Sequence, residues 1–551
     1  MVLLRGHLIT MSTVDTAADS VAITDGRVTA VGDAGSIRAR VASSTRVIDL
    51  DGRTVTPGLI DSHAHLATLA ARDLFKADLS APGTTSIAQL VARLRTVVDA
   101  TPQGQWVQGH GWAESALTEL RSPTRQDLDL ASRQHPILVT HLTGHSAVAN
   151  SVALALAGIG RESVDPVGAT VGRDSTTGEP TGLLTELPAI QMVQRHIPEL
   201  GAADWDRVVA YGSQRWLEEG VTAIKDNYSR EEYGSVVAAF QRMSQLGTLR
   251  LRPYLMCRVE SPEDVRFVAD HSPRSWTPAD GFPKLGGVKL FMDGSLVGRT
   301  AWMNEPYKDS TACGYPALEL STLARTVSAA AECGLQVGIH AIGDRAVSAV
   351  LDAYEMARMR RRSGRRFSIM HALLVDRAAV RRMKAMRVIV ETQSAFMPAL
   401  AAGYANAIDS RRLRRIIPLR TLIHHGLTVT NGSDSPTAPI GPRYGLWAAC
   451  TRPGSIDGVA SSPYGRRECI SAFTALQMYT SMGASAMELD DQIGSIEVGK
   501  LADLVVWDRN PLTIPAGELK EARPMMTIVN GAVAFEAKGT PCLRQEDRPE
   551  Y

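Results

Sequence analysis

The sequence has no strong excess of either charge and no long uninterrupted apolar run. Its 59 basic and 58 acidic residues give a formal net charge of +1, so the chain creates no field that would attract nucleic acid or anionic lipid. No window approaches the roughly eighteen consecutive apolar residues of a transmembrane helix. We therefore expect neither a nucleic-acid partner nor a membrane partner.

Cysteine is also scarce. The chain has 6 cysteines, none of them in a C-x-x-C pair, and their spacing indicates no disulfide framework. The segment Met1–His7 turns polar at once and lacks the long apolar core of a secretory signal peptide. We expect a protein of the reducing cytoplasm.

The ends of the chain both have β character. Residues 1–54 contain short apolar segments around an Asp25-Gly26 turn, and residues 491–551 contain similar segments around Asn530-Gly531. Both dipeptides are strong hairpin signals. Because chain termini often lie close together, we expect residues 1–54 and 491–551 to form one small β-sandwich domain.

Between these ends, residues 55–490 alternate short apolar segments with helical patterns. The predicted strands are the run before His63, then 221–226, 251–256, 287–291, 335–339, 367–370, 388–392 and 427–430. Eight such units predict an α/β fold, a (β/α)8 TIM-type barrel. Residues 67–215 follow the first strand and are too long for a loop, so we expect an inserted subdomain that covers the site as a lid.

Candidate metal ligands stand at the predicted strand ends. His63 and His65 are two apart and so share one face of the first strand. His340 and His371 end the fifth and sixth strands, and Asp434 follows the eighth. Each residue alone has an ordinary structural alternative, a satisfied histidine or an aspartate in a turn or helix cap. Their common position at the functional end of one barrel favours a metal site.

Lys289 lies within an apolar strand, the fourth of the predicted barrel. Burial of an unpaired ammonium is costly and lowers its pKa, which makes the amine nucleophilic. Such an amine can take up carbon dioxide to form a carbamate able to bridge two metals. The alternative is an ion pair with a barrel carboxylate such as Asp293 or Asp226.

Several motifs resemble the amidohydrolase superfamily. They are Thr56–His65, Ile339–Asp344, Met370-His371, Gly432–Pro436 and Gly494–Asp503; Val288–Leu296, Arg299–Ala301 and Gly144–Ser151 are similar to the amidohydrolase 3 branch that includes N-substituted formamide deformylases. The resemblance implies a metal-dependent hydrolase of amide or related C–N bonds, with zinc the usual metal. It further implies that His63, His65, Lys289, His340 and His371 are metal ligands and that Asp434 touches the metal and acts as general base. Whether one or two metals bind depends on carboxylation of Lys289. Val297 stands where a small residue is expected, so we expect a narrowed pocket.

Six further residues are candidates for substrate binding: Trp112, His145 and Glu186 in the inserted segment, and Asp293, Arg299 and Trp302 after the fourth strand. The tryptophans would hold an apolar or aromatic group, with ordinary packing as the alternative. Arg299 would bind a substrate carboxylate, with a salt bridge to Asp293 as the alternative.

The sequence therefore predicts an enzyme that hydrolyses an amide-type bond of a small molecule, such as an N-formyl or N-acyl amine. A cyclic amide, a carbamate or an ester is the same-fold alternative. A catalytically inactive barrel that serves as a binding or scaffold protein is the alternative of another class. Oligomeric state stays open, with a homodimer among the expected states.

Overall fold

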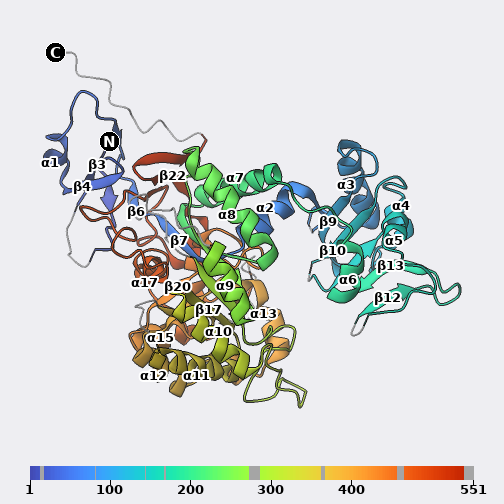
Figure 1. The fold of residues 1–551 in the computed structure, drawn as a ribbon. Helices are drawn as coiled ribbons and strands as arrows, with labels where there is room; N and C mark the ends of the chain where they lie inside the picture. The colour runs from blue at the N-terminus through green and yellow to red at the C-terminus, as the bar shows by residue number, and fades with distance from the viewer. Residues whose placement is uncertain are drawn as a thin grey trace. The chain divides into compact units, whose positions relative to one another are not determined.

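The computed structural model describes residues 1–12, 18–80, 82–142, 144–166, 169–271, 286–360, 366–455 and 465–538. The chain divides into two compact units. Unit 1 comprises Met1–Ala67 and Val209–Tyr551, and unit 2 comprises Thr68–Val208 (Figure 1).

The centre of unit 1 is an eight-stranded sheet whose strands all run parallel, in the order β20-β19-β18-β17-β16-β15-β14-β7. The strands are β7 (Leu59–Ala64), β14 (Val221–Tyr228), β15 (Arg252–Arg258), β16 (Gly287–Phe291), β17 (Gln336–Ala341), β18 (Phe367–His371), β19 (Ile389–Thr392) and β20 (Val429–Asn431). Thr430 Oγ1 donates a hydrogen bond of 2.7 Å to Ser62 Oγ, which joins the last strand to the first. The predicted eight parallel strands are confirmed, and they form a nearly closed barrel.

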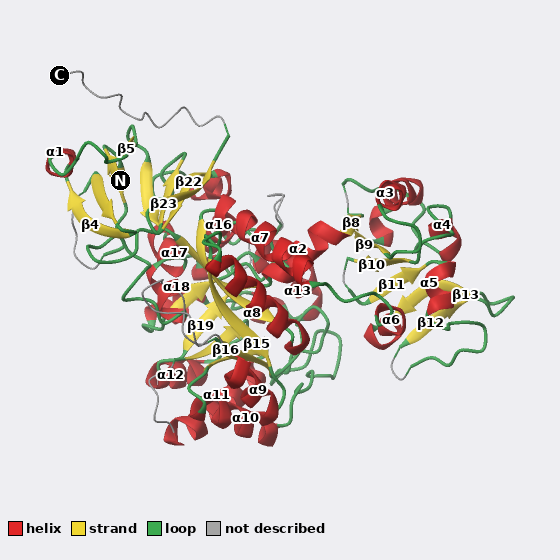
Figure 2. Ribbon diagram, turned by 45° about the horizontal axis from the view of Figure 1, so that its top comes forward, coloured by secondary structure: helices red, strands yellow, loops and turns green. Residues whose placement is uncertain are grey.

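Helices surround this sheet on its outer side (Figure 2). They include α8 (Arg230–Gln245), α9 (Pro262–His271), α10 (Leu320–Glu332), α11 (Asp344–Arg360), α12 (Arg377–Met386), α13 (Phe396–Ala407), α14 (Ser410–Leu413), α15 (Leu419–His424), α16 (Pro442–Thr451), α17 (Ala472–Met478) and α18 (Ser481–Ala486). Local sequence sets where they begin: Ser229 and Glu232 form a capping box at α8, and the Asp376 carboxylate caps α12. Because helices cover them, the barrel strands are buried along almost their whole length.

Two small sheets combine the ends of the chain. One has the order β4-β3-β1-β5 and the other β2-β6-β21-β22-β23. Their strands are β1 (Val2–Leu4), β2 (His7–Leu8), β3 (Ser20–Thr24), β4 (Arg27–Gly32), β5 (Val47–Asp49), β6 (Thr54–Pro57), β21 (Leu504–Trp507), β22 (Pro524–Val529) and β23 (Ala532–Glu536); the helix α1 (Ala34–Arg38) follows β4. One buried cluster contains side chains of both sheets, among them Leu3, Val21, Val506 and Ile528.

Both predicted hairpin turns are present in these sheets. Asp25 and Gly26 join β3 to β4, and Asn530 and Gly531 join β22 to β23. All four residues have positive φ, between 49° and 76°, which the tight turn of a two-residue hairpin requires and which glycine, asparagine and aspartate tolerate best.

Unit 2 is built on a six-stranded mixed sheet with the order β12-β13-β11-β10-β9-β8. Its elements are β8 (Lys76–Asp78), α3 (Ile87–Ala100), β9 (Val107–Trp112), α4 (Arg125–Asp129), β10 (Ile137–His141), β11 (Ser146–Ala149), α5 (Ser151–Leu156), β12 (Thr170–Arg173), β13 (Pro180–Thr185) and α6 (Leu187–Gln194). Successive residues of β10 alternate between two cores: Leu138 packs with α5 and α6, whereas Val139 packs with α3 and α4.

The two boundaries between the units fall inside the helices α2 (Leu66–Phe75) and α7 (Ala202–Glu218). The compact unit thus lies within the segment 67–215 that the sequence marks as an insertion. No helix in the described part of the chain combines the length and apolar composition needed to cross a membrane.

Candidate metal and active site

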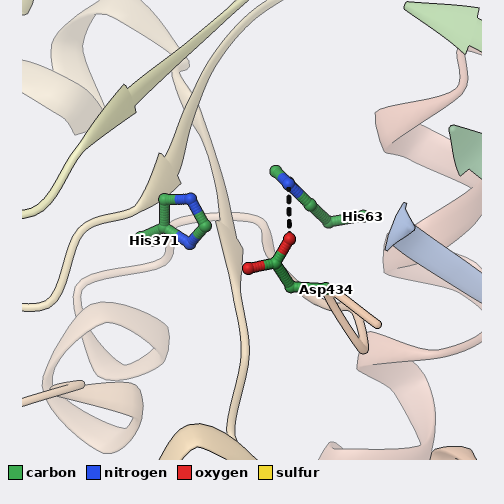
Figure 3. A group of neighbouring side chains, drawn as sticks. All are labelled: His63, His371 and Asp434. Atoms are coloured by element: carbon green, nitrogen blue, oxygen red, sulfur yellow. Dashed lines mark ion pairs between the residues drawn. The ribbon is translucent and has the colours of Figure 1, made fainter. Parts of the chain in front are cut away.

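The candidate ligands meet at the carboxyl ends of the barrel strands. His63 lies near the end of β7 and His65 just beyond it, Lys289 lies in β16, His340 in β17 and His371 at the end of β18. Asp434 follows β20. Ligand atoms of His63, His371 and Asp434 lie within 4.8 Å of one another, and Figure 3 shows these three side chains converging from separate segments.

Short distances connect all six side chains. Asp434 Oδ1 lies 3.3 Å from His63 Nε2 and 3.1 Å from His65 Nε2, and Lys289 Nζ lies 3.0 Å from His63 Nε2. The His371 ring centroid is 5.0 Å from that of His63 and 4.5 Å from that of His340. The structure therefore brings together all the residues that the sequence nominated as ligands.

Hydrogen bonds fix the orientation of three of the four imidazoles. His65 Nδ1 lies 3.1 Å from the Asn227 carbonyl oxygen, and His371 Nδ1 lies 2.7 Å from Gln393 Oε1. His340 Nε2 lies 3.1 Å from the Gly294 carbonyl oxygen. Because a carbonyl oxygen only accepts, each of these ring nitrogens carries the proton, and the other nitrogen of each ring keeps a lone pair for a metal.

Burial keeps these histidines neutral. Desolvation, aided by the Lys289 charge, lowers the pKa of His63 to about 3 and the pKa of His340 to about 4. Desolvation and the neighbouring histidines hold the pKa of His371 well below its usual value. Neutral imidazole is the form that binds metals, so these three histidines are in their binding state at neutral pH.

The pKa values of Asp434 and Lys289 are both lowered, which favours the charged form of Asp434 and the neutral form of Lys289. Burial opposes ionisation of Asp434, but His63 and His65 more than offset it and hold the pKa of the carboxyl well below its usual value. Burial lowers the pKa of Lys289 to about 8, against the opposing effect of Asp434 and Glu391. The site thus contains an ionised carboxylate beside an amine that loses its proton more readily than usual.

The donor set fits a divalent metal such as zinc. Four imidazoles and one carboxylate match the nitrogen and oxygen ligands that zinc takes in proteins. His63 Nδ1 adds an observation from burial, because it is buried and has no hydrogen-bond partner among the described residues. Its Nε2, by contrast, lies 3.0 Å from Lys289 Nζ and 3.3 Å from Asp434 Oδ1, so this ring meets the ligand cluster through Nε2.

The backbone at two of these residues is strained. His371 has φ 75° and Asp434 has φ 49°, both in the left-handed region that side chains with a Cβ rarely adopt. Such conformations cost on the order of 1–3 kcal/mol each and concentrate at functional sites. Asp61 holds the strained turn at Asp434: its carboxylate accepts from Ser433 N at 2.9 Å and from Ser433 Oγ at 2.6 Å.

Lys289 does not form the ion pair considered from the sequence. The Asp293 carboxylate accepts from the backbone N–H groups of Trp302, Ile342 and Gly343, and Asp226 accepts from Leu66 N at 2.8 Å. Among the described residues no carboxylate is in ion-pair contact with Lys289. Lys225 of β14 and Glu391 of β19 instead form an ion pair in which both side chains are fully buried.

A cavity of about 260 Å³ opens onto the ligand cluster. Apolar atoms form most of the surface of its wall, and the lining residues are His65, Lys289, Phe291, Ser295, Leu296, Val297, His340, Ile342, His371, Phe396, Leu400, Tyr404, Asp434 and Thr437. Val297, the residue that departs from the expected pattern, is among them. The cavity is therefore suited to a small substrate with an apolar group beside its reacting bond.

Three predicted substrate contacts in unit 1 have other partners. Buried Asp293 binds the backbone as described, and burial raises its pKa to about 7. Exposed Arg299 donates to the carbonyl oxygens of Lys308 and Asn406 rather than to Asp293. The Arg345 guanidinium lies 4.7 Å from the ring centroid of Trp302. Among the described residues the cavity lining includes none of the three, so they act here as supports of the loops after β16 and β17.

The predicted contacts in unit 2 divide into two kinds. Trp112 is 1% exposed and its Nε1 donates to the Val139 carbonyl oxygen at 3.3 Å, which favours the packing alternative. His145 Nδ1 and Glu186 Oε2 form an exposed pair at 3.1 Å. The substrate role of this pair stays a prediction.

Sequence reasoning missed the groups that orient the ligands, namely Asn227, Gly294, Gln393 and Asp61. A signal was present for two of them: Gln393 follows the seventh predicted strand directly, and Asp61 is part of the His63 motif. Tyr404 was also missed, because its position on a helix gives no strand-end signal.

This geometry defines a candidate metal site at the carboxyl ends of the parallel barrel strands. Residues 46–535 match the amidohydrolase family, and the chain belongs to that family. It is 28% identical to YtcJ of Bacillus subtilis over 96% of this chain and 98% of that protein. It is 28% identical to the N-substituted formamide deformylase of Arthrobacter pascens over 98% of this chain and 99% of that enzyme.

A solved structure is similar along nearly the whole chain. It is an uncharacterized metal-dependent hydrolase from Pyrococcus horikoshii, with a TM-score of 0.76 and 26% sequence identity, and the match covers 94% of this chain and 99% of that one.

Proposed function

We propose that this protein is a metal-dependent hydrolase that cleaves an amide-type C–N bond of a small molecule. The single observation that carries the proposal is the position of Asp434 Oδ1, which lies 3.3 Å and 3.1 Å from two imidazole nitrogens beside the cavity. One carboxylate oxygen at a cluster of neutral histidines is the arrangement of a metal ligand that can also exchange a proton.

The residues that would hold the metal are His63, His65, His340 and His371, with Asp434 and, once carboxylated, Lys289. Zinc fits this donor set, and carboxylated Lys289 would allow two ions instead of one. A bound divalent metal would polarise the scissile carbonyl and lower the pKa of water to about 7.

Asp434 carries the proton in the proposed reaction. Its carboxyl is ionised at neutral pH, so it can accept one proton from the attacking water as the water oxygen bonds to the acyl carbon. The C–N bond then breaks, and Asp434 passes that proton to the leaving nitrogen. The products are a carboxylic acid and an amine.

An N-formyl or N-acyl amine is the substrate class we favour. The cavity wall is mainly apolar, which suits the uncharged substituent of such an amide, and the deformylase of Arthrobacter pascens is similar along the whole chain. The charged Arg299, which would suit a substrate carboxylate, donates to backbone carbonyls instead.

The test combines metal analysis with a substrate panel. Elemental analysis of the purified protein should find stoichiometric metal, and zinc-loaded protein should release amine from members of a panel of N-formyl and N-acyl amines. Asp434→Asn should lower kcat by about 10²- to 10⁴-fold with the melting temperature maintained. Asp352→Asn is the matched control, since Asp352 pairs with Arg382 at the surface.

Other outcomes would redirect or refute the proposal. Turnover of cyclic amides, carbamates or esters, but not of the acyclic amides, would keep the hydrolase and change the bond. Absence of both stoichiometric metal and turnover, or an Asp434→Asn variant with normal kcat, would refute it.

A further inference from the structure

The helix α13 forms one wall of the cavity. Phe396, Leu400 and Tyr404 on this helix all line it, and they are four residues apart, so they lie on one face of the helix. The Phe396 ring lies over the His371 ring with centroids 5.9 Å apart and an interplanar angle of 14°. This contact fixes the start of the helix against a candidate metal ligand.

Tyr404 is the polar residue of this apolar stripe. Its side chain is 1% exposed, and its hydroxyl has no hydrogen-bond partner among the described residues. Two other buried tyrosines of the barrel do have such a partner. Tyr307 donates to the Ala301 carbonyl oxygen at 2.9 Å, and Tyr354 donates to the Ser368 carbonyl oxygen at 2.6 Å.

The hydroxyl of this cavity-lining side chain opens to the cavity rather than being sealed in the core. A substrate that carries an acceptor could therefore receive a hydrogen bond from it. The remaining polar lining residues are less suited. Ser295 Oγ already accepts from Gly298 N at 2.9 Å, and Thr437 is exposed.

The position of Tyr404 relative to Asp434 indicates which substrate atom it meets. Tyr404 and Asp434 both line the same cavity, and burial together with the Asp434 carboxylate raises the pKa of the Tyr404 phenol. The phenol is a hydrogen-bond donor at every working pH. If Asp434 activates the attacking water, the acyl carbon must lie beside Asp434, and the acyl oxygen can then face the wall that α13 forms in the same cavity.

We propose that Tyr404 is a catalytic residue that donates a hydrogen bond to the substrate acyl oxygen as negative charge develops there. This role rests on the proposed amide hydrolysis and adds a donor from the chain itself to that reaction. A preorganised donor at such an oxygen acts more strongly in the transition state than in the ground state.

Tyr404→Phe tests the proposal with amides that the wild-type enzyme turns over. We expect kcat to fall about 100-fold, with KM changed less than about twofold and metal content unchanged. The melting temperature should stay the same or rise, because no protein partner loses a hydrogen bond. Tyr354→Phe is the matched control: it should lower the melting temperature and leave kcat within about twofold.

A second measurement does not depend on turnover. A phosphonate analogue of the tetrahedral intermediate should bind Tyr404→Phe about 100-fold more weakly than wild type by calorimetry, since the analogue presents the developing oxyanion. An unchanged kcat with a raised KM, equal affinity for the analogue, or a lower melting temperature with lost metal would each overturn the assignment.

The failure of this proposal is distinguishable from the failure of the proposed function. An active wild-type enzyme whose Tyr404→Phe variant is equally active refutes only the role of Tyr404. A wild-type protein that neither hydrolyses the panel nor binds the analogue refutes the proposed function and this role together.

Discussion

Gln393 is the residue whose removal should most directly reveal the metal site. Its Oε1 lies 2.7 Å from His371 Nδ1, and both side chains are buried. This bond keeps the proton on Nδ1, so that Nε2 presents its lone pair. In Gln393→Leu the ring can move its proton to Nε2, and metal binding must then reverse that change and leave Nδ1–H without an acceptor.

The expected magnitude follows from this geometry. A buried donor left unsatisfied costs about 1–3 kcal/mol, which is roughly 5- to 150-fold in an equilibrium constant. Loss of a residue that orients a metal-binding histidine typically costs about 10- to 100-fold in metal affinity. We therefore expect the Kd for zinc to rise about 10- to 100-fold, measured by competition of the metal-free protein with a chromophoric chelator.

A matched control separates orientation from general damage. Gln336 is another fully buried glutamine of the barrel, on β17, and its Nε2 donates to the Ala486 carbonyl oxygen at 2.9 Å. Gln336→Leu should lower the melting temperature and leave zinc affinity unchanged. A Kd for Gln393→Leu within about twofold of wild type, or an equal loss in both variants, would refute the reasoning.

Three further predictions test other parts of the site. Burial raises the pKa of Asp226 from its ordinary value of 3.8 to about 6, so this carboxyl lowers the free energy of unfolding as pH rises from about 4 to about 6, by up to ~3 kcal/mol. The free energy of unfolding of Asp226→Asn, measured in denaturant, should therefore rise relative to that of wild type as pH rises across this range. A difference between the two proteins that does not change with pH would contradict this. Val297 lines the cavity, so Val297→Ala should raise kcat/KM for the bulkiest amides of the panel about tenfold relative to the smallest; an unchanged ratio would show that Val297 does not narrow the site. If Lys289 is carboxylated, ¹³C-bicarbonate should give a carbamate resonance by NMR that Lys289→Met lacks, and equal spectra would exclude the carbamate.

The sequence was sufficient to predict the barrel and its ligand cluster because both depend on local pattern. Each barrel strand is a short apolar run, and the ligands follow from the rule that functional side chains stand at the strand ends. His63 and His65 needed only the two-residue period of a strand. The hairpins at Asp25-Gly26 and Asn530-Gly531 likewise needed only the turn preference of those residues.

Contacts that depend on packing could not be read in the same way. Trp112 could line a pocket or fill a core on sequence grounds, and only the burial of its ring among α3, β9 and β10 favours the core. Arg299 had a plausible partner in Asp293, but the loop after β16 presents backbone N–H groups to Asp293 and backbone carbonyls to Arg299. Every residue except proline carries the same backbone N–H and C=O groups. The sequence therefore does not show where these groups will replace a side chain as the hydrogen-bond partner.

The groups that orient the ligands follow a rule that becomes visible only with the strand order. His65 follows β7 and is held by Asn227 of β14; His340 of β17 is held by Gly294, which follows β16; His371 of β18 is held by Gln393, which follows β19. In each case the partner comes from the chain at the end of an adjacent strand. A parallel barrel sets neighbouring strand ends side by side, so the residue that fixes a ligand is found across the sheet rather than along the sequence.

His63 is the exception, since its Nδ1 has no partner among the described residues, and it is the ring in direct contact with both Lys289 and Asp434. Its orientation therefore depends on the ligand cluster itself, which makes His63 the histidine most sensitive to whether the metal is bound.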